Sequence, residues 1–229
     1  MMKTFSLILP AAGVGKRSGL NRPKQYAEIA GEPMLRWTIK AFAQLEECRE
    51  IVVAIDPEWH SVAENSAREF ANVRFVDGGS ERQDSIRNGL DELREEVDVI
   101  LVHDAARPAV STELIQRVVE RAAESGAAIP AMPIAETVKR VRENRIVETL
   151  PRADLVTAQT PQGFHPDLLR QAYAHALETG FIGTDDASLV EALGEAVEIV
   201  SGEPTNIKVT WPEDFERVEE ILGERINGR

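Results

Sequence analysis

The stretch that decides the fold class is FSLILPAAGVGKRSG, residues 5–19. It begins with Phe5–Leu9, a short and mostly apolar run of the kind found in strands that are covered on both faces. A loop of small and basic residues follows directly where that strand should end. Open α/β sheets bind their ligands at the carboxyl ends of their strands. The stretch therefore predicts an α/β protein whose ligand site begins at this loop.

Outward from this stretch, short apolar runs alternate with segments of helical periodicity. The further predicted strands are Ile51–Ile55, Val73–Val76, Val99–Val102, Ala127–Ala131 and Val197–Val200. The predicted helices are one opened by Pro33, one with a Ser80–Gln83 capping box, and two that end at Gly126 and Gly180. Alternating strands and helices are typical of a doubly wound, mostly parallel α/β sheet.

One segment breaks this alternation. Glu136–Val141 and Ile146–Leu150 are rich in β-formers and in charge, and residues 142–145 separate them, which predicts a hairpin. The hairpin has too little apolar surface to be stable alone, so we expect it to project and to pack on a partner subunit. The alternative is an edge hairpin that lies on its own domain. Because the sequence contains no internal repeat, low-complexity tract or linker, we expect a single domain over residues 1–229.

Composition and charge limit the classes of partner. The 229 residues carry 26 Lys and Arg against 39 Asp and Glu, a net charge of −13, which argues against nonspecific binding to nucleic acid or anionic membranes. No apolar run approaches the roughly 20 residues of a membrane span. The single cysteine, Cys48, fits a reducing, cytoplasmic setting, and because an apolar run already starts at Phe5 we expect no secretory signal.

Positive charge is concentrated at the amino end of this acidic chain. Residues 1–27 contain no acidic residue, and their bases are Lys3, Lys16, Arg17, Arg22 and Lys24. The small residues at 11–13 allow backbone N–H groups to approach an anion closely. The loop is not a Walker motif, since Arg17 stands where Ser or Thr is required, and its GxGxxxG spacing is not the dinucleotide fingerprint. We therefore expect a site for a small polyanion, with a plain glycine-rich turn as the alternative.

Two later segments also place polar groups where a predicted strand ends. DGGSERQDS, residues 77–85, combines a tight turn with a helix N-terminus, whose unpaired N–H groups can bind a ligand. Asp104 follows the strand Val99–Val102 and is placed to hold Mg²⁺ or a ribose hydroxyl, since magnesium takes one or two carboxylates together with substrate phosphates. The alternatives are structural: Ser80 as a simple helix cap, and Asp104 as a turn cap or a partner of Arg107.

In the second half of the chain, polar residues stand between apolar runs at Thr137, Arg152, Thr160, Thr184 and Lys208. By position alone most of these are typical of loops. Lys208 is the exception, because it lies within an Ile-Lys-Val-Thr strand pattern. Other chemistries find little support, since the sequence has no HExxH motif, no Cys/His metal spacing and no GxSxG elbow.

Taken together, several segments resemble one family. LPAAGVGKRSG, PKQ, DGGSERQDS, VHDAARP, TPQGF, TDDAS and NIKVT, which run from residue 9 to residue 210, are similar in type and order to the motifs of the 2-C-methyl-D-erythritol 4-phosphate cytidylyltransferase family. The resemblance implies a CTP-dependent and Mg²⁺-dependent enzyme of non-mevalonate isoprenoid synthesis. It also implies a Rossmann-like nucleotidyltransferase fold and a homodimer joined by a β-arm, which would correspond to the predicted hairpin at about 134–152.

The resemblance also implies roles for individual residues. The nucleotide-binding residues would be Ala11, Ala12, Gly13, Gly15, Gly79, Ser80, Arg82, Ser85, Asp104 and Ala105. Arg17 and Lys24 would stabilise the transition state, and Asp104 would bind the metal or the ribose. Methylerythritol phosphate would be surrounded by Arg107, Thr137, Arg152, Thr160, Thr184 and Lys208, with Thr137 and Arg152 supplied by the second subunit. Lys16 departs from the pattern, because the family often has Arg at this position.

The reaction that this resemblance implies can be argued physically. A phosphate monoester is mostly dianionic at pH 7, because its second pKa is about 6, so the nucleophile needs no general base. The catalytic residues Arg17, Lys24, Arg152 and Lys208 would instead neutralise and orient two reactants that repel each other. Two alternatives remain open. One is a ribitol-5-phosphate cytidylyltransferase with a similar body, and the other is a noncatalytic nucleotide-sensing module that would bind CTP without releasing pyrophosphate.

Overall fold

The computed structural model describes residues 3–13, 22–226 and 228 of the chain. Its described part is built on an eight-stranded sheet with the order β10-β7-β11-β6-β1-β4-β5, and β12 pairs with β7 outside this path. The strands are β1 (Phe5–Ala11), β4 (Cys48–Ile55), β5 (Val73–Asp77), β6 (Val99–Val102), β7 (Ala127–Pro133), β10 (Val156–Ala158), β11 (Gln162–Phe164) and β12 (Glu198–Ser201). The predicted strands are all confirmed, and their bounds shift by up to three residues at either end.

Parallel pairing dominates the sheet, as expected. β1 runs parallel to β4 and β6, β4 runs parallel to β5, and β12 runs parallel to β7. β10 and β11 are antiparallel to their neighbours and have no counterpart among the predicted strands. They are only three residues long, and Gln162-Gly163-Phe164 carries no apolar run, so periodicity alone could not reveal them.

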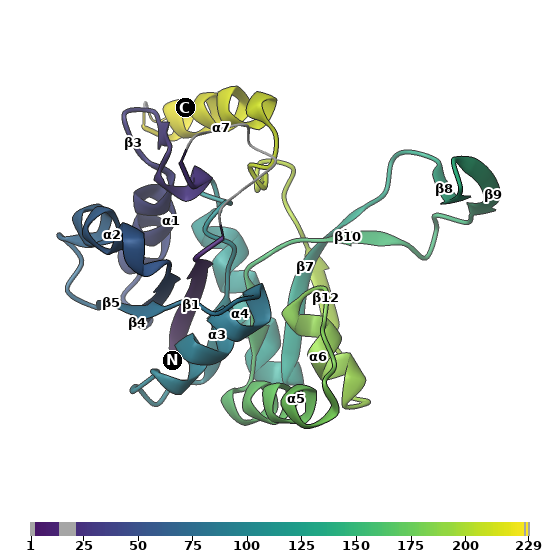
Figure 1. The fold of residues 1–229 in the computed structure, drawn as a ribbon, viewed down its shortest axis with the longest axis horizontal. Coiled ribbons are helices and arrows are strands. Elements are labelled where there is room, and N and C mark those ends of the chain that lie inside the picture. The colour runs from purple at the N-terminus through teal and green to yellow at the C-terminus, as the bar shows by residue number, and fades with distance from the viewer. Residues whose placement is uncertain (1–2, 14–21, 227, 229) are drawn as a thin grey trace.

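Helices cover both faces of the sheet (Figure 1). They are α1 (Met34–Ala43), α2 (His60–Ala67), α3 (Arg82–Asp91), α4 (Thr112–Ser125), α5 (Pro166–Thr179), α6 (Asp186–Ala192) and α7 (Pro212–Ile226). The side chains of β1 alternate between the faces: Leu7 and Leu9 pack with α1, α2 and α4, whereas Ile8 packs with α3, α5 and α6. A third cluster joins α7 to Met34 and Val209, beside the carboxyl ends of the strands.

The predicted helix ends are confirmed except at α3. Gly126 and Gly180 follow α4 and α5 with positive φ angles of 93° and 69°, as helix-terminating glycines do. The capping box at α3 is formed by Glu81 and Asp84, not by Ser80 and Gln83. The predicted box lies one residue too early: Ser80 stands just before the N-cap residue Glu81, and its hydroxyl donates to Asp84 Oδ2 at 2.7 Å.

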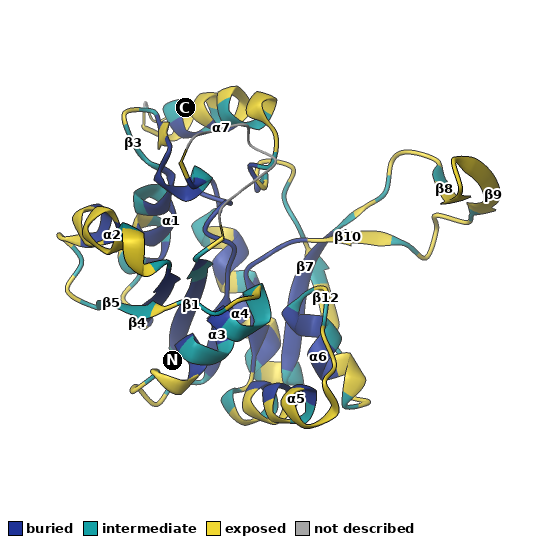
Figure 2. Ribbon diagram, in the orientation of Figure 1, coloured by how far each residue is buried: buried dark blue, intermediate teal, exposed yellow. Residues whose placement is uncertain are grey.

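The predicted hairpin is confirmed as a projecting arm (Figures 1 and 2). It consists of β8 (Val138–Arg142) and β9 (Arg145–Leu150), which among the described residues pair only with each other. Glu143 and Asn144 join them with φ angles of 47° and 60°, the left-handed pair that a two-residue hairpin turn requires. The arm extends away from the sheet and is exposed on almost all its residues, so the alternative of a hairpin lying on its own domain is wrong.

The described residues also contain four short elements. β2 (Glu28–Ile29) and β3 (Glu32–Pro33) form a small ladder, and the 3-10 turns are η2 (Lys24–Tyr26) and η3 (Pro57–Trp59). No helix within the described residues is long and apolar enough to cross a membrane.

Candidate active site

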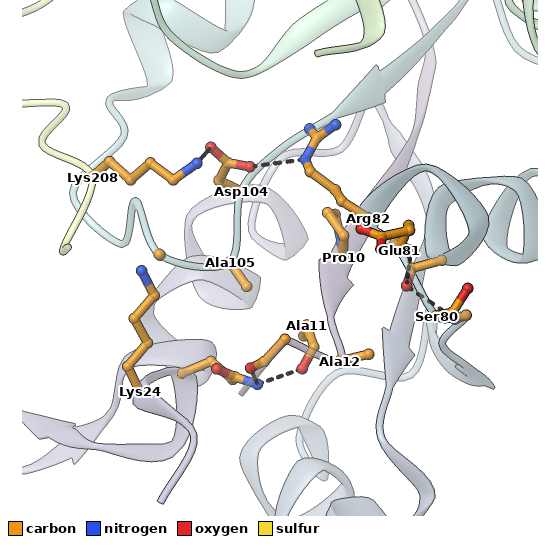
Figure 3. Close-up of a pocket in the computed structure, with 15 residues that line it drawn as sticks. Pro10, Ala11, Ala12, Lys24, Ser80, Glu81, Arg82, Asp104, Ala105 and Lys208 are labelled. Atoms are coloured by element: carbon orange, nitrogen blue, oxygen red, sulfur yellow. Dashed lines mark hydrogen bonds and ion pairs between the residues drawn. The ribbon is translucent and has the colours of Figure 1, made fainter. Parts of the chain in front are cut away.

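A cavity of about 420 Å³ opens where the carboxyl ends of β1 and β6 meet the N-terminus of α3 (Figure 3). It is lined by Pro10, Ala11, Ala12, Gly13, Lys24, Gln25, Gly79, Ser80, Glu81, Arg82, Ser85, Asp104, Ala105, Ala106 and Lys208. The three segments that the sequence places at strand ends therefore border one hollow. They do so because β1 and β6 are neighbouring parallel strands that end at the same edge of the sheet.

One wall is the loop that follows β1. Gln25 is buried and donates its side-chain amide to the carbonyl oxygens of Ala11, at 2.5 Å, and Gly13, at 3.0 Å. These bonds tie the loop to η2, the turn that also carries Lys24. Lys24 Nζ donates to the carbonyl of Val209 at 2.5 Å, which brings a lysine near the amino end to the segment before α7. Gly15 and Arg17 lie outside the described residues.

The opposite wall is the turn between β5 and α3. It contains Gly78 and Gly79, and a Cβ on Gly78 would lie 2.2 Å from the Cβ of Ala12, so only glycine allows the two loops to approach. Ser85 holds the turn in place: its Oγ accepts from Gly79 N at 3.0 Å and donates to Glu81 O at 3.1 Å. Gly79, Ser80, Arg82 and Ser85 line the cavity as expected.

Asp104 is the electrostatic centre of the site. Its carboxylate lies 2.8 Å from Lys208 Nζ, 3.4 Å from Arg82 Nε and 3.6 Å from Arg107 Nε. Burial by itself would raise the pKa of Asp104, but these three cations outweigh it and hold the pKa well below its usual range. Asp104 is thus charged and paired not with Arg107 alone but with three cations from separate segments.

Behind Asp104, Thr160 forms a buried pair with His103, a residue that the sequence did not single out. His103 Nε2 faces the carbonyl of Arg107 at 3.1 Å and therefore donates to it, so Nδ1 accepts from the Thr160 hydroxyl at 2.9 Å. The Thr160 oxygen in turn accepts from the Asp104 backbone N–H at 3.0 Å. Burial lowers the pKa of His103 to about 4, so the ring is neutral.

The residues expected around the second substrate divide into two groups. Lys208 lines the cavity, and Arg107 lies just behind it, bonded to the Asn206 carbonyl at 2.7 Å. Thr160 is buried and its hydroxyl faces His103. Thr137, Arg152 and Thr184 are exposed and do not line the cavity, and the Arg152 guanidinium donates to the carbonyl of Ala135 at the base of the arm. Within one chain the structure therefore brings Lys208 alone of the six to the cavity wall.

Known proteins resemble this chain over nearly its whole length. The model of the 2-C-methyl-D-erythritol 4-phosphate cytidylyltransferase family matches residues 5–224. The chain belongs to this family. A curated relative of that name from Bacillus cytotoxicus is 42% identical over 221 residues, which cover 95% of this chain and 97% of the relative. The family and the cytidylyltransferase function expected from the sequence are thereby confirmed.

Solved structures of the family share the fold. The 2-C-methyl-D-erythritol 4-phosphate cytidylyltransferase from Thermus thermophilus is 35% identical, with a TM-score of 0.79 over 98% of this chain and 100% of that one. The 4-diphosphocytidyl-2C-methyl-D-erythritol synthase from Anaerococcus prevotii is 30% identical, with a TM-score of 0.84 over 96% of both chains. The doubly wound, mostly parallel fold is therefore confirmed as that of this cytidylyltransferase family.

Sequence reasoning missed several residues that hold the site together, one of which, Gln25, also lines the cavity. Gln25, His103, Gln162 and Asp186 each lie inside a segment that carries the family resemblance, but no pattern distinguishes them from their neighbours. Gln162, for example, accepts from the backbone N–H groups of Asp186 and Ala187 at the start of α6, 24 and 25 residues away in sequence. Only contacts between distant segments reveal these roles.

Proposed function

We propose that the protein transfers CMP from CTP to 2-C-methyl-D-erythritol 4-phosphate and releases pyrophosphate. The observation that carries the proposal is the cavity itself. A loop of small residues after β1 and two lysines from opposite ends of the chain, Lys24 and Lys208, line one hollow at the carboxyl edge of the sheet. Such a hollow suits a triphosphate that must meet a second phosphate.

In the proposed reaction, a phosphate oxygen of the acceptor attacks the α-phosphorus of CTP. A new P–O bond forms, the bond between the α-phosphorus and its bridging oxygen breaks, and pyrophosphate leaves with that electron pair. The acceptor phosphate is mostly dianionic at pH 7 and needs no base. His103 is not free to act as a base, because both of its ring nitrogens are hydrogen-bonded, one to the carbonyl of Arg107 and the other to the hydroxyl of Thr160.

The cationic side chains then have two tasks. Lys24 and Arg17 would stabilise the charge that develops on the transferred and departing phosphates, as preorganised donors do in other phosphoryl transfers. Lys208 would hold the incoming phosphate in line, together with Arg152 from a second subunit, which is catalysis by orientation. The nucleotide would rest on Ala11, Ala12 and Gly13 and against the Gly79–Ser85 turn.

Magnesium fits the residues that line the cavity. Asp104 offers a charged carboxylate at the cavity wall, and the ion prefers one or two carboxylates together with substrate phosphates. Among the described residues no group of three or more His, Cys, Asp or Glu side chains could hold a metal without such phosphates. Asp104 would hold the ion, which when bound would neutralise phosphate charge. We expect chelation to abolish pyrophosphate release and added Mg²⁺ to restore it.

We further propose that the protein is a homodimer joined by the arm. The arm leaves Val141, Ile146 and Val147 at least half exposed, with 54%, 66% and 53% of their surfaces accessible. Thr137 and Arg152, which are expected at the second substrate, lie at the base of this arm and away from the cavity of their own chain. An arm that reaches a neighbouring subunit would place them at that neighbour's site.

The decisive experiment measures pyrophosphate release from CTP with 2-C-methyl-D-erythritol 4-phosphate and, in parallel, with ribitol 5-phosphate. We expect turnover with the first acceptor to exceed turnover with the second by orders of magnitude. Faster turnover of ribitol 5-phosphate would make the protein a ribitol-5-phosphate cytidylyltransferase. Binding of CTP without pyrophosphate release from either acceptor would identify a nucleotide-sensing module.

A further inference from the structure

Asp186 is a fully buried carboxylate beside the site that the proposed reaction does not use. It is the first residue of α6 and is 0% exposed. Its Oδ2 lies 2.8 Å from Arg82 Nη2, and its Oδ1 accepts from the Tyr173 hydroxyl at 2.6 Å. Since Asp186 does not line the main cavity, it cannot touch a ligand there.

Arg82 connects this buried group to the cavity. Its guanidinium is bound at two points: Nη2 pairs with Asp186, and Nε lies 3.4 Å from Asp104 Oδ1 (Figure 3). Asp104 in turn pairs with Lys208 at 2.8 Å. The result is a series of alternating charges, Asp186–Arg82–Asp104–Lys208. It joins α6, α3, the loop after β6 and the segment before α7.

The buried end of this series of charges is held by hydrogen bonds from two elements. Burial and the neighbouring Asp186 raise the pKa of Tyr173. Its hydroxyl therefore stays protonated and donates a hydrogen bond to Asp186. The backbone N–H of Asp186 donates to Gln162 Oε1 at 3.1 Å, and Gln162 belongs to β11 in the central sheet. Asp186 is therefore held by a helix and by a strand, whereas Arg82 stands on the first turn of α3 with about a third of its side chain exposed.

We propose that Asp186 is a positioning residue of the CMP transfer, which fixes the Arg82 guanidinium at the wall of the nucleotide cavity. The inference rests on the proposed function and on the place of Arg82 in the cavity wall. Without Asp186, the guanidinium keeps Asp104 as its single anionic partner and is drawn toward it. That movement changes the shape of the cavity, and the guanidinium then competes with Lys208 for the Asp104 carboxylate.

The test compares a buried and an exposed carboxylate of α6. Asp186→Asn keeps the shape of the side chain and removes its charge. We expect kcat/KM for CTP to fall about 10–100-fold, the loss that is typical when a carboxylate supporting a metal ligand is removed from a metalloenzyme. Glu191→Gln is the matched control. Glu191 is an exposed residue of the same helix and does not line the cavity. We expect kcat/KM for CTP in the control variant to stay within about twofold of wild type.

A double-mutant cycle shows whether Asp186 acts through Arg82. On an Arg82→Gln background, Asp186→Asn should lower kcat/KM for CTP by less than about threefold, because the group that it positions is absent. Full additivity of the two losses would overturn the inference, as would wild-type kcat/KM in Asp186→Asn. Wild-type kcat/KM in Arg82→Gln alone would instead overturn the proposed place of Arg82 in the site.

Thermal unfolding of every variant separates this role from a loss of folding. If Asp186→Asn does not fold, Tyr173→Phe decides, because it removes one hydrogen bond to Asp186 and leaves the ion pair in place. We expect Tyr173→Phe to lower kcat/KM for CTP about 2–10-fold. On the Arg82→Gln background, the same substitution should not lower kcat/KM any further. An unchanged kcat/KM in Tyr173→Phe would then overturn the inference.

Discussion

Two lysines from distant parts of the sequence line this cavity. Lys24 stands on η2 between the loop after β1 and the segment before α7, and its ammonium group lines the cavity. Lys208 reaches the same cavity from the far end of the chain and pairs with Asp104. The site thus depends less on any one motif than on cations delivered from distant positions.

Replacing Lys24 by Ala should lower turnover about 10²–10³-fold or more, the usual cost of removing one preorganised transition-state donor. The measurement is pyrophosphate release at saturating CTP and acceptor. Lys40→Ala is a suitable control, since Lys40 lies on α1 over the ring of Trp37 and does not line the cavity. Near-normal turnover in the Lys24 variant would contradict the role proposed for this residue.

Removal of the Thr160 hydroxyl should lower the free energy of unfolding. Thr160→Val keeps the volume but leaves the Asp104 N–H and His103 Nδ1 without a partner, at a cost of about 1–3 kcal/mol in the free energy of unfolding. Thr160→Ser retains the hydroxyl and should lose clearly less. Urea unfolding of both variants checks this, and equal stability of the valine and serine proteins would contradict it.

At the scale of elements, the ends of neighbouring strands are held together by a carboxylate. Asp98, just before β6, accepts from the backbone N–H of Thr4 at 2.8 Å and from Lys3 Nζ at 3.2 Å, just before β1. The Thr4 N–H, followed by Lys3, holds the pKa of Asp98 below its usual range. The charged carboxylate therefore stabilises the parallel pairing on which the cavity is built.

This contact predicts a pH dependence with a definite sign. Because the folded protein lowers the pKa of Asp98, its contribution is present above the unfolded value of about 3.9 and is lost as pH falls through the folded value. Asp98→Asn should be less stable than wild type at pH 7, and the difference should shrink below about pH 4. Urea unfolding from pH 7 to pH 3 measures it, and a constant difference would contradict the assignment.

At the scale of the whole molecule, the arm holds Arg152 away from the cavity of its own chain. It carries exposed apolar side chains, and Arg152 at its base does not line the cavity of its own chain. If the arm reaches a second subunit, each active site combines Lys24 from one chain with Arg152 from the other.

Mixing two inactive variants tests this arrangement. Arg152→Ala and Lys24→Ala should each be nearly inactive alone, whereas a heterodimer of the two has one site with both residues intact. If subunits exchange freely, equal amounts should recover up to about a quarter of wild-type activity. Tagged subunits show whether exchange occurs. No recovery despite exchange would mean that each site is built within one chain.

The sequence by itself determined the alternation of strands and helices, the arm, and the loops that border the cavity. These features could be predicted because periodicity, turn residues and charge clusters are local properties of the chain. β10 and β11 could not, since three-residue strands without an apolar run depend on their neighbours for pairing.

Only the tertiary structure decided which side chains meet. Arg82 and Asp186 are 104 residues apart in sequence, and Lys24 and Val209 are 185 apart. It also gave His103 and Thr160 a buried role behind Asp104, whereas the family resemblance implied a substrate contact for Thr160. The physical reason is that burial, ion pairing and pKa shifts arise from distances between remote segments, which no local pattern encodes.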